Sequence, residues 1–249
     1  MAEIKKFAKY EKGAYHWHEM RKSLKRFNAG LAARYKISEE VIIKYCKNLS
    51  TIVDIGCGDG YLTTRLAQIY GNATVIGFDI EELAIKLAIE QSSKFSLKNL
   101  SFIHGDVFEF MKNKKVDLIV ATDVIEHLDN QEDFIKNCLN ILKGGGFLFI
   151  STPIRIKEFP DDQYHIKEFF YDELRRFIEK FGFLIIENFC SHDYCLTEKY
   201  NKAYKFLGIG KIRLYKYYYN FLSIYFNKNV FEAKNSKLST MQYLLAKIE

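Results

Sequence analysis

Residues 51–60, TIVDIGCGDG, decide the fold of this chain of 249 residues. TIVDI is a short run rich in β-branched residues, which favours a buried strand. The run breaks at Gly56, Gly58 and Gly60, and residues 61–70, YLTTRLAQIY, then carry apolar side chains at helical spacing. A strand that enters a helix through such a turn offers a backbone that a ligand can approach closely, next to the electropositive end of a helix.

The same alternation continues along the chain. Strand-like runs recur in ATVIGFDI, LSFIHGDV, KVDLIVATDV, GGGFLFISTP, FLIIENFC and TMQYLLAKI, and helical patterns such as EELAIKLAIEQSSKF and NQEDFIKNCLNILK lie between them. Apolar strands that alternate with amphipathic helices predict an α/β fold with a parallel sheet covered on both faces. Ligands of such sheets bind at the carboxyl ends of the strands, so the residues after each strand are the candidates for chemistry.

Composition excludes several classes of protein. No stretch approaches the ~20 apolar residues that a membrane-spanning helix needs, and MAEIKKFAKYEKG at the start has no apolar core. We therefore expect a soluble protein without a secretory signal or a membrane span. The net charge of +6 permits anionic partners without indicating nucleic acid. The odd number of scattered cysteines argues against disulfides and zinc knuckles and suits the cytoplasm: Cys46, Cys57, Cys138, Cys190 and Cys195.

Acidic residues lie at the ends of the first three predicted strands. Asp54, just before the glycines, can hold an ammonium group through the turn. Asp79 follows Gly58 at about the 20 residues expected for a ribose-binding acid, and its carboxylate can accept two hydrogen bonds from ribose hydroxyls. Asp106 can accept a hydrogen bond from the exocyclic amine of an adenine. A nicotinamide dehydrogenase would instead show G-x-G-x-x-G and would not favour an acid at position 54 beside its pyrophosphate.

The ordered motifs VDIGCGDG, GFDI, HGDV, ATDVIEHL and LKGGGFLFISTP resemble those of class I S-adenosylmethionine-dependent methyltransferases, over roughly residues 51–189. The resemblance implies a Rossmann-like fold of seven strands, the last inserted antiparallel. It implies that Gly56 and Gly58 line the methionine part of S-adenosylmethionine and that Asp79 holds the ribose. It also implies that Asp106 and Val107 contact the adenine. The predicted cofactor pocket comprises Asp54, Gly56, Cys57, Gly58, Asp79, Ile80, Asp106, Val107 and Thr122.

Acidic and imidazole side chains follow the fourth and fifth strands. The fourth strand ends in ATDVIEHL. If a helical turn begins there, Asp123 and His127 lie on the same face of that turn, and Glu126 is adjacent to this face. The loop after STP offers His165. Both loops leave the same edge of the sheet, so two carboxylates and two imidazoles can converge beside the transferable methyl group. Such a ligand set suits Mg²⁺, Mn²⁺ or Fe²⁺ rather than structural zinc.

Two interpretations of these four residues stand. The layout resembles the metal site of small-RNA 3′-end 2′-O-methyltransferases, which use a Glu-x-x-Glu-His run and a distant His; Asp123 stands here in the first place. The surrounding sequence is similar to bacterial methyltransferases of surface-polysaccharide and small-metabolite modification, where EHL also occurs without a metal. Asp123, Glu126, His127 and His165 thus form a Mg²⁺ or Mn²⁺ site, or His127 or His165 is a metal-free general base assisted by Glu126.

The sequence divides the chain into a helical segment 1–50, a cofactor-binding core 51–190, an insertion 191–237 and a last strand 238–249. In the first segment, Tyr15, His16 or Trp17 form part of a lid over the cofactor, or Trp17 anchors the helix to the sheet. The insertion is the candidate for acceptor recognition, because aromatic faces stack on sugars or bases and cations match phosphate. A core helix pair and a dimer surface are the alternatives. Its residues of interest are Tyr215, Tyr217, Tyr218, Tyr219, Lys211, Arg213 and Lys216.

The sequence therefore predicts a cytoplasmic S-adenosylmethionine-dependent O-methyltransferase. Its expected acceptor is a small polar molecule: a sugar, a nucleotide-linked sugar or a phosphorylated metabolite of surface-polysaccharide biosynthesis. One alternative is an RNA 2′-O-methyltransferase with a metal site, although no RNA-binding appendage or basic stripe is visible. Another is a non-catalytic, cofactor-binding accessory protein. The sequence leaves a homodimer open.

Overall fold

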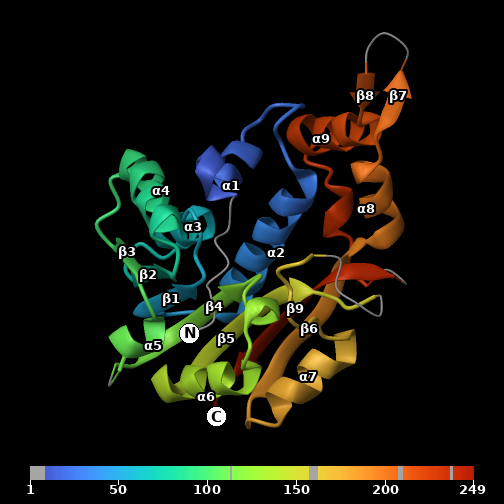
Figure 1. The fold of residues 1–249 in the computed structure, drawn as a ribbon. Helices are drawn as coiled ribbons and strands as arrows, with labels where there is room; N and C mark the ends of the chain where they lie inside the picture. The colour runs from blue at the N-terminus through green and yellow to red at the C-terminus, as the bar shows by residue number, and fades with distance from the viewer. Residues whose placement is uncertain (1–8, 113, 157–161, 207–209, 236–237) are drawn as a thin grey trace.

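The computed structural model describes residues 9–112, 114–156, 162–206, 210–235 and 238–249. A seven-stranded sheet in the order β3-β2-β1-β4-β5-β9-β6 runs through its centre (Figure 1). β1 to β5 pair in parallel, and β9 lies antiparallel between β5 and β6. This order confirms the predicted fold, with its last strand inserted antiparallel. The strands are β1 Thr51–Ile55, β2 Thr74–Asp79, β3 Leu100–His104, β4 Val116–Thr122, β5 Leu142–Pro153, β6 Leu184–Asp193 and β9 Ser239–Lys247.

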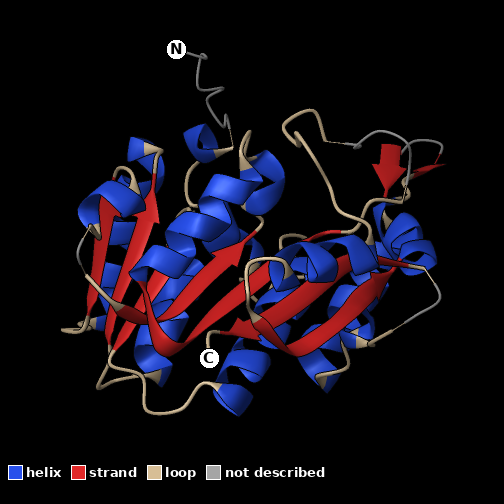
Figure 2. Ribbon diagram, turned by 90° about the horizontal axis from the view of Figure 1, so that it is seen from below, coloured by secondary structure: helices blue, strands red, loops and turns tan. Residues whose placement is uncertain are grey.

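Helices cover both faces of the twisted sheet (Figure 2). α2 and α3 pack on one face, and α5, α6 and α7 pack on the other. β4 shows why, because successive side chains of a strand point to opposite faces. Leu118 and Val120 pack in the core cluster under α2 and α3, whereas Ile119 and Ala121 pack in the cluster under α5, α6 and α7. The helices are α1 Tyr15–Glu19, α2 Ala29–Tyr45, α3 Tyr61–Ile69, α4 Glu82–Ser92, α5 Val107–Phe110, α6 Gln131–Ile141, α7 Tyr171–Glu179, α8 Tyr194–Asn201 and α9 Leu214–Phe226.

One strand boundary differs from the sequence pattern. The motif GGGFLFISTP predicts that the fifth strand begins at Gly144. Instead α6 ends at Ile141, and β5 begins at Leu142, which pairs with Val116. The glycines therefore lie inside the strand rather than at its start, and the ladder is irregular just after the first pair.

The segment between β6 and β9 holds α8, a small hairpin of β7 Tyr204–Phe206 and β8 Gly210–Ile212, and then α9. α9 lies beside α8 and the start of α2 (Figure 1). A third core cluster joins these elements through Phe27, Ala29, Ala33, Tyr200, Tyr219 and Phe231. Within the described ranges, no helix is both long enough and apolar enough to cross a membrane.

Candidate active site

The turn between β1 and α3 is shaped by glycine. Gly56 and Gly58 adopt left-handed φ angles of 68° and 55°. A Cβ on Gly56 would overlap the Val124 side chain, and one on Gly58 would overlap the Tyr10 hydroxyl. The turn is therefore tightly covered, and both positions require glycine for their conformation as well as for space.

Asp79, at the end of β2, is fixed against this turn. One of its carboxylate oxygens accepts a hydrogen bond from the Gly58 backbone N at 2.8 Å, and the other accepts one from the Glu81 backbone N at 2.8 Å. Burial raises the pKa of Asp79, although these two N–H donors oppose the rise. A carboxylate held in this way has a fixed direction and keeps lone pairs for further donors, as a ribose-binding acid needs. The next residue, Ile80, is exposed.

The other predicted cofactor residues are placed less uniformly. Asp106 is exposed and caps α5, its Oδ1 accepting a hydrogen bond from the Phe108 backbone N at 2.8 Å. Val107 buries its side chain in the core, so a ligand can meet only its backbone. Cys57 is buried within the turn, and Thr122 is half-buried at the end of β4. Contacts of these residues with a cofactor stay predictions.

Asp54 is a buried acid below the turn. Its Oδ2 accepts a hydrogen bond from the Thr63 hydroxyl at 2.6 Å, and its Oδ1 has no partner among the described residues. Desolvation raises the pKa of Asp54 to about 7, against the lowering effect of Thr63. A buried acceptor without a partner is unfavourable unless a ligand supplies a donor. The arrangement therefore fits a cationic ligand group at this end of the sheet.

The N-terminal helix is attached to the same turn through Asp59. The carboxylate of Asp59 accepts hydrogen bonds from the backbone N and the Nδ1 of His16, both at 2.9 Å. The Trp17 indole N–H donates to the Asp59 carbonyl oxygen at 2.8 Å, and its ring stacks on Phe95. α1 thus covers the turn, and Trp17 also anchors it; the ring of Tyr15 lies against that of His16. Opening and closing of this cover stays a prediction.

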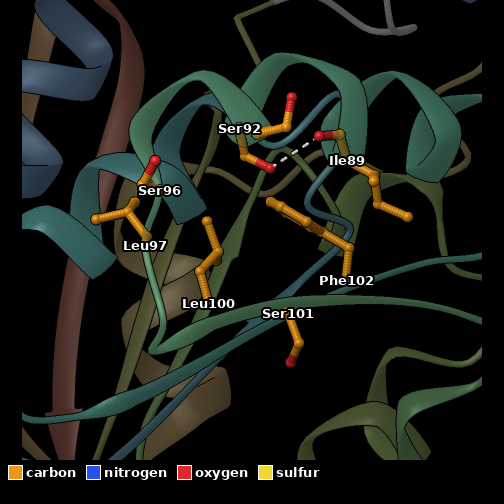
Figure 3. Close-up of a pocket in the computed structure, with 8 residues that line it drawn as sticks. Ile89, Ser92, Ser96, Leu97, Leu100, Ser101 and Phe102 are labelled. Carbon is orange, nitrogen blue, oxygen red and sulfur yellow. Dashed lines mark hydrogen bonds between the residues drawn. The ribbon is translucent and has the colours of Figure 1, made fainter.

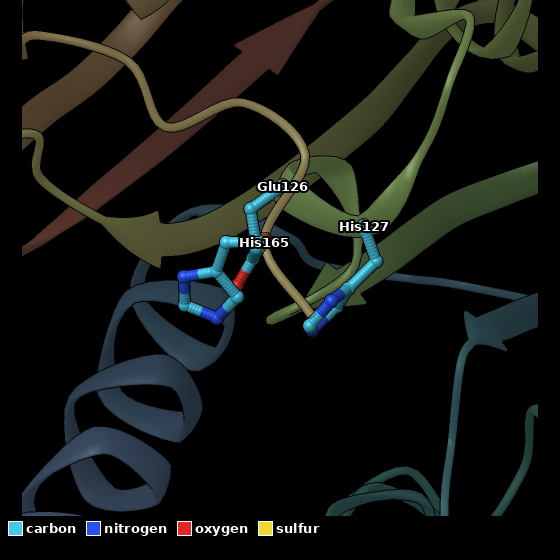
Figure 4. Close-up of side chains that lie close together, drawn as sticks. All are labelled: Glu126, His127 and His165. Atoms are coloured by element: carbon cyan, nitrogen blue, oxygen red, sulfur yellow. The ribbon is translucent and has the colours of Figure 1, made fainter. Parts of the chain in front are cut away.

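Glu126, His127 and His165 come together at the ends of β4 and β5 (Figure 4). One potential ligand atom from each lies within 4.8 Å of the others, and the two imidazole rings are 4.9 Å apart. Glu126 and His127 belong to a short 3₁₀ helix, Ile125–His127. The loop that carries His165 is held to it because the Glu126 carbonyl oxygen accepts a hydrogen bond from the Ile166 backbone N at 2.7 Å.

Both imidazoles are oriented through Nδ1. The Nδ1 of His127 lies 2.9 Å from the Tyr164 carbonyl oxygen, which can only accept, so this nitrogen carries the proton. The Nδ1 of His165 lies 2.6 Å from Glu168 Oε1. Burial lowers the pKa of His127 and favours its neutral form. In the neutral His127 ring Nε2 is then the unprotonated nitrogen, which is the form of a general base or of a metal ligand.

Glu126 has a fully buried carboxyl group. Its Oε2 accepts a hydrogen bond from the Thr152 hydroxyl at 2.9 Å, and its Oε1 has no partner in the described part of the chain. Burial, together with the nearby charge of Asp123, raises the pKa of Glu126 well above its usual value. The environment of this carboxyl group therefore disfavours its charged form unless a cation approaches. An unpartnered oxygen beside two oriented imidazoles fits a hard divalent cation.

Asp123 is not in this cluster, although the sequence predicted it as the fourth ligand. Its backbone has a left-handed φ of 54°, and its N–H donates to the Ser151 carbonyl oxygen at 2.9 Å. No helical turn therefore begins at Asp123, and the Asp123 and His127 side chains do not share one helical face. The carboxylate instead accepts a hydrogen bond from Arg34 of α2. Burial lowers the pKa of Arg34, but the negative charge of Asp123 opposes this effect, and the pKa is raised overall.

Arg34 was missed by the sequence reasoning. It is the one arginine in the otherwise largely apolar stretch LAARYKI of α2, and that local contrast was the available signal. Its neighbours Ala33 and Tyr35 are buried, because α2 packs on the sheet. The Arg34 side chain therefore extends from a helix that is held against the core.

A separate pocket lies between α4 and β3 (Figure 3). Its volume is about 260 Å³. The lining is apolar apart from serine hydroxyls and contains no titratable side chain, so we assign no chemistry to it: Ile89, Ser92, Ser93, Ser96, Leu97, Leu100, Ser101 and Phe102.

Comparison with known proteins identifies the family. The family model of the methyltransferase domain matches residues 47–221, which include the glycine turn and the histidine cluster. The chain belongs to the class I S-adenosylmethionine-dependent methyltransferases. The resemblance drawn from the sequence motifs is thereby confirmed.

Two relatives of this methyltransferase are similar to it over part of its length. A probable S-adenosylmethionine-dependent methyltransferase of Mycolicibacterium smegmatis is 30% identical over 138 residues, covering 53% of this chain and 51% of that protein. The ubiquinone biosynthesis O-methyltransferase of Rickettsia canadensis is 28% identical over 159 residues, covering 62% and 65%. This chain thus spans less than two thirds of the length of these relatives.

A solved structure supports the fold. Coclaurine N-methyltransferase, bound to N-methylheliamine and S-adenosylhomocysteine, superposes with a TM-score of 0.56 at 16% identity. The match covers 85% of this chain and 72% of that protein. At this identity the likeness concerns the fold alone, and the roles of individual residues stay predictions.

Proposed function

We propose that this chain transfers a methyl group from S-adenosylmethionine to a hydroxyl oxygen of a small polar acceptor. The observation that carries the proposal is the pair of imidazoles, His127 and His165, each oriented through Nδ1 beside the buried Glu126. A hydroxyl acceptor must lose a proton, whereas an amine needs only to arrive neutral. A prepared proton acceptor therefore favours oxygen over nitrogen.

The cofactor, when bound, supplies a methyl group on a positively charged sulfur. The chain's own residues then have three tasks. Asp79 holds the ribose, because its carboxylate is fixed by two backbone N–H groups. Asp54 offers its unpartnered oxygen to the ammonium group. His127 or His165 accepts the acceptor's hydroxyl proton at Nε2, and the surrounding loops align the oxygen with the methyl carbon.

A divalent cation fits the same cluster. Glu126, His127 and His165 would hold Mg²⁺ or Mn²⁺ through one carboxylate oxygen and two imidazole nitrogens. The ion would supply a lower pKa at the acceptor hydroxyl. The unpartnered Oε1 of Glu126 supports this version. We leave Asp123 out of the proposed ligand set because it lies outside the group of three and its Oδ2 accepts a hydrogen bond from Arg34.

The acceptor class rests on sequence resemblance. We propose a sugar, a nucleotide-linked sugar or a phosphorylated metabolite of surface-polysaccharide biosynthesis, handled in the cytoplasm. Residues 191–237 are the proposed recognition insertion. Within it Tyr219 packs into the third core cluster, whereas Tyr215, Tyr217 and Tyr218 are exposed.

Transfer of tritium from labelled S-adenosylmethionine tests the proposal. Hydroxyl-bearing sugars and sugar nucleotides form one set of acceptors, and amines and a short RNA with a free 3′ end form two others. We expect label in the first set, and a loss of about 10²–10⁴ in kcat for His165→Asn. His18→Asn, a histidine outside the cluster, is the matched control and should keep wild-type kcat.

Two outcomes would contradict the proposal. Label only in amines would show a nitrogen acceptor in place of the proposed oxygen acceptor, and label only in RNA would favour the 2′-O-methyltransferase alternative.

Mn²⁺ binding, followed by electron paramagnetic resonance, tests the metal separately from activity. Binding that is present in the wild type and lost in His165→Asn supports a metal. Activity without Mn²⁺ binding leaves the histidines as general bases and overturns the metal version.

A further inference from the structure

α9 exposes an aromatic face to solvent. Of the seventeen large apolar side chains that are exposed among the described residues, seven belong to this helix. Four of them recur at helical spacing and so share one side of α9. We call these the α9 face; they are Leu214, Tyr218, Phe221 and Tyr225. Tyr218 is 55% exposed and Tyr225 is 65% exposed. An exposed apolar patch of this kind is typical of an interaction site.

The opposite side of α9 is fixed to the protein. Asn220 is fully buried, and its Nδ2 donates to the Phe27 carbonyl oxygen at 2.6 Å and to the Leu24 carbonyl oxygen at 2.9 Å. Its Oδ1 accepts a hydrogen bond from the Tyr200 hydroxyl at 2.9 Å. Tyr219 packs in the same cluster. The α9 face therefore belongs to a helix whose opposite side is packed against the protein, and its exposure is not the result of a detached helix.

Positive charge is concentrated around this face. Residues 199–231 contain seven Lys and Arg and no Asp or Glu, whereas the whole chain has a net charge of only +6. The rest of the chain is therefore slightly negative. Lys211 and Arg213 precede α9, Lys228 follows it, and all three are exposed. Five of the seven cations precede α9, one lies within it and one follows it.

Exposed aromatic side chains next to positive charge indicate which kind of partner binds the α9 face. A second copy would place the same cationic segment against itself in a symmetric dimer, which like charges disfavour. Exposed Tyr and Phe beside Lys and Arg suit the boundary between headgroups and acyl chains, where one end of each side chain stays wet. α9 has 13 residues and is about 20 Å long, too short to span a bilayer but long enough to lie along one.

We propose that α9 docks this chain onto a lipid bilayer that carries anionic headgroups. Phe221 and Tyr225 enter the interface, and Lys211, Arg213 and Lys228 contact the lipid phosphates. The proposal does not depend on methyl transfer, since the surface is defined by its exposure and charge alone.

Cosedimentation of the full chain with vesicles tests it. The vesicles are pure phosphatidylcholine, or phosphatidylcholine with one third phosphatidylglycerol. We expect binding to the second kind alone, weakened by added NaCl because salt screens the headgroups. Phe221→Ser with Tyr225→Ser, and separately Lys211→Glu with Arg213→Glu, should each weaken binding by about tenfold or more.

Matched controls carry equal changes elsewhere. Ile43→Ser with Ile89→Ser exchanges two exposed apolar residues, and Lys94→Glu with Lys98→Glu makes the same change in charge. Both controls should bind vesicles as the wild type does. Circular dichroism and the midpoint of thermal unfolding show that each variant folds. Absence of wild-type binding to anionic vesicles, equal loss in the controls, or binding to RNA without binding to vesicles would each overturn the proposal.

Discussion

Binding of the cofactor should release a proton near neutral pH, and Asp54 is the group that we expect to release it. The carboxyl group is buried, its Oδ1 has no partner in the described structure, and burial raises its pKa to about 7. An ammonium group of a bound ligand favours the ionised form and so lowers this pKa. Asp54→Asn keeps the size and the polarity of the side chain but cannot ionise.

The size of the effect follows from that pKa. With a value of about 7, roughly a tenth of the protein has an ionised Asp54 at pH 6, and about nine tenths has it at pH 8. If the ionised form is the one that binds, the apparent Kd at pH 6 is about tenfold weaker than at pH 8, or ~1.4 kcal/mol. About 0.9 proton leaves per ligand bound at pH 6, and about 0.5 leaves at pH 7.

Isothermal titration calorimetry with S-adenosylhomocysteine measures both quantities. Titrations at each pH in two buffers of different ionisation enthalpy give the number of protons released. Asp54→Asn should bind with little dependence on pH and release almost no proton, while Asp133→Asn, an exposed carboxylate on α6, should behave as the wild type does. A wild-type affinity that is flat between pH 6 and 8, or proton release that survives in Asp54→Asn, would refute the reasoning.

Three further outcomes are expected. Asp79→Ala should weaken S-adenosylhomocysteine binding by about tenfold or more, because a fixed charged acceptor is lost; unchanged affinity would contradict the ribose contact. Burial lowers the pKa of His192 to about 4, so the unfolded chain takes up a proton first as pH falls and stability drops below about pH 6.5. Between pH 7 and 5 in urea, the wild type should lose about 2 kcal/mol more than His192→Asn, and equal losses would remove this role. Thr152→Val leaves Glu126 Oε2 without a donor and should lower the free energy of unfolding by about 1–3 kcal/mol; a variant as stable as the wild type would show that the carboxyl group finds another partner.

Local sequence signals predicted the parts of the molecule that local physics controls. The glycines at 56 and 58 adopt left-handed φ, as a tight turn requires, and Asp79 lies against that turn because both stand at the ends of adjacent parallel strands. His165 meets His127 for the same reason, since the loops after β4 and β5 leave one edge of the sheet. Period, turn residues and the direction of a parallel sheet suffice for these features.

Asp123 shows where the sequence could not predict the site. A helical spacing placed it with His127, but its conformation is set by partners far away in the sequence: the Ser151 carbonyl oxygen and Arg34. Nothing within a few residues of Asp123 indicates a positive φ, and Arg34 reaches it only because α2 packs on the sheet. Long-range contacts of this kind override local pattern, and they did so at the candidate active site.

Asp54 and Glu126 point to a common design. Each is a buried acid with one oxygen hydrogen-bonded to a threonine and one without a partner in the described chain. The raised pKa of Asp54 means that the folded chain keeps a proton that the unfolded chain releases above about pH 4, so this group destabilises the fold as pH rises toward 7. A cationic ligand reverses that loss only where the carboxylate is ionised. Saturating S-adenosylhomocysteine at a fixed concentration should therefore raise the free energy of unfolding by about 1.4 kcal/mol more at pH 8 than at pH 6, and by equal amounts in Asp54→Asn. An equal gain at both pH values in the wild type would show that the unpaired oxygen faces no cation.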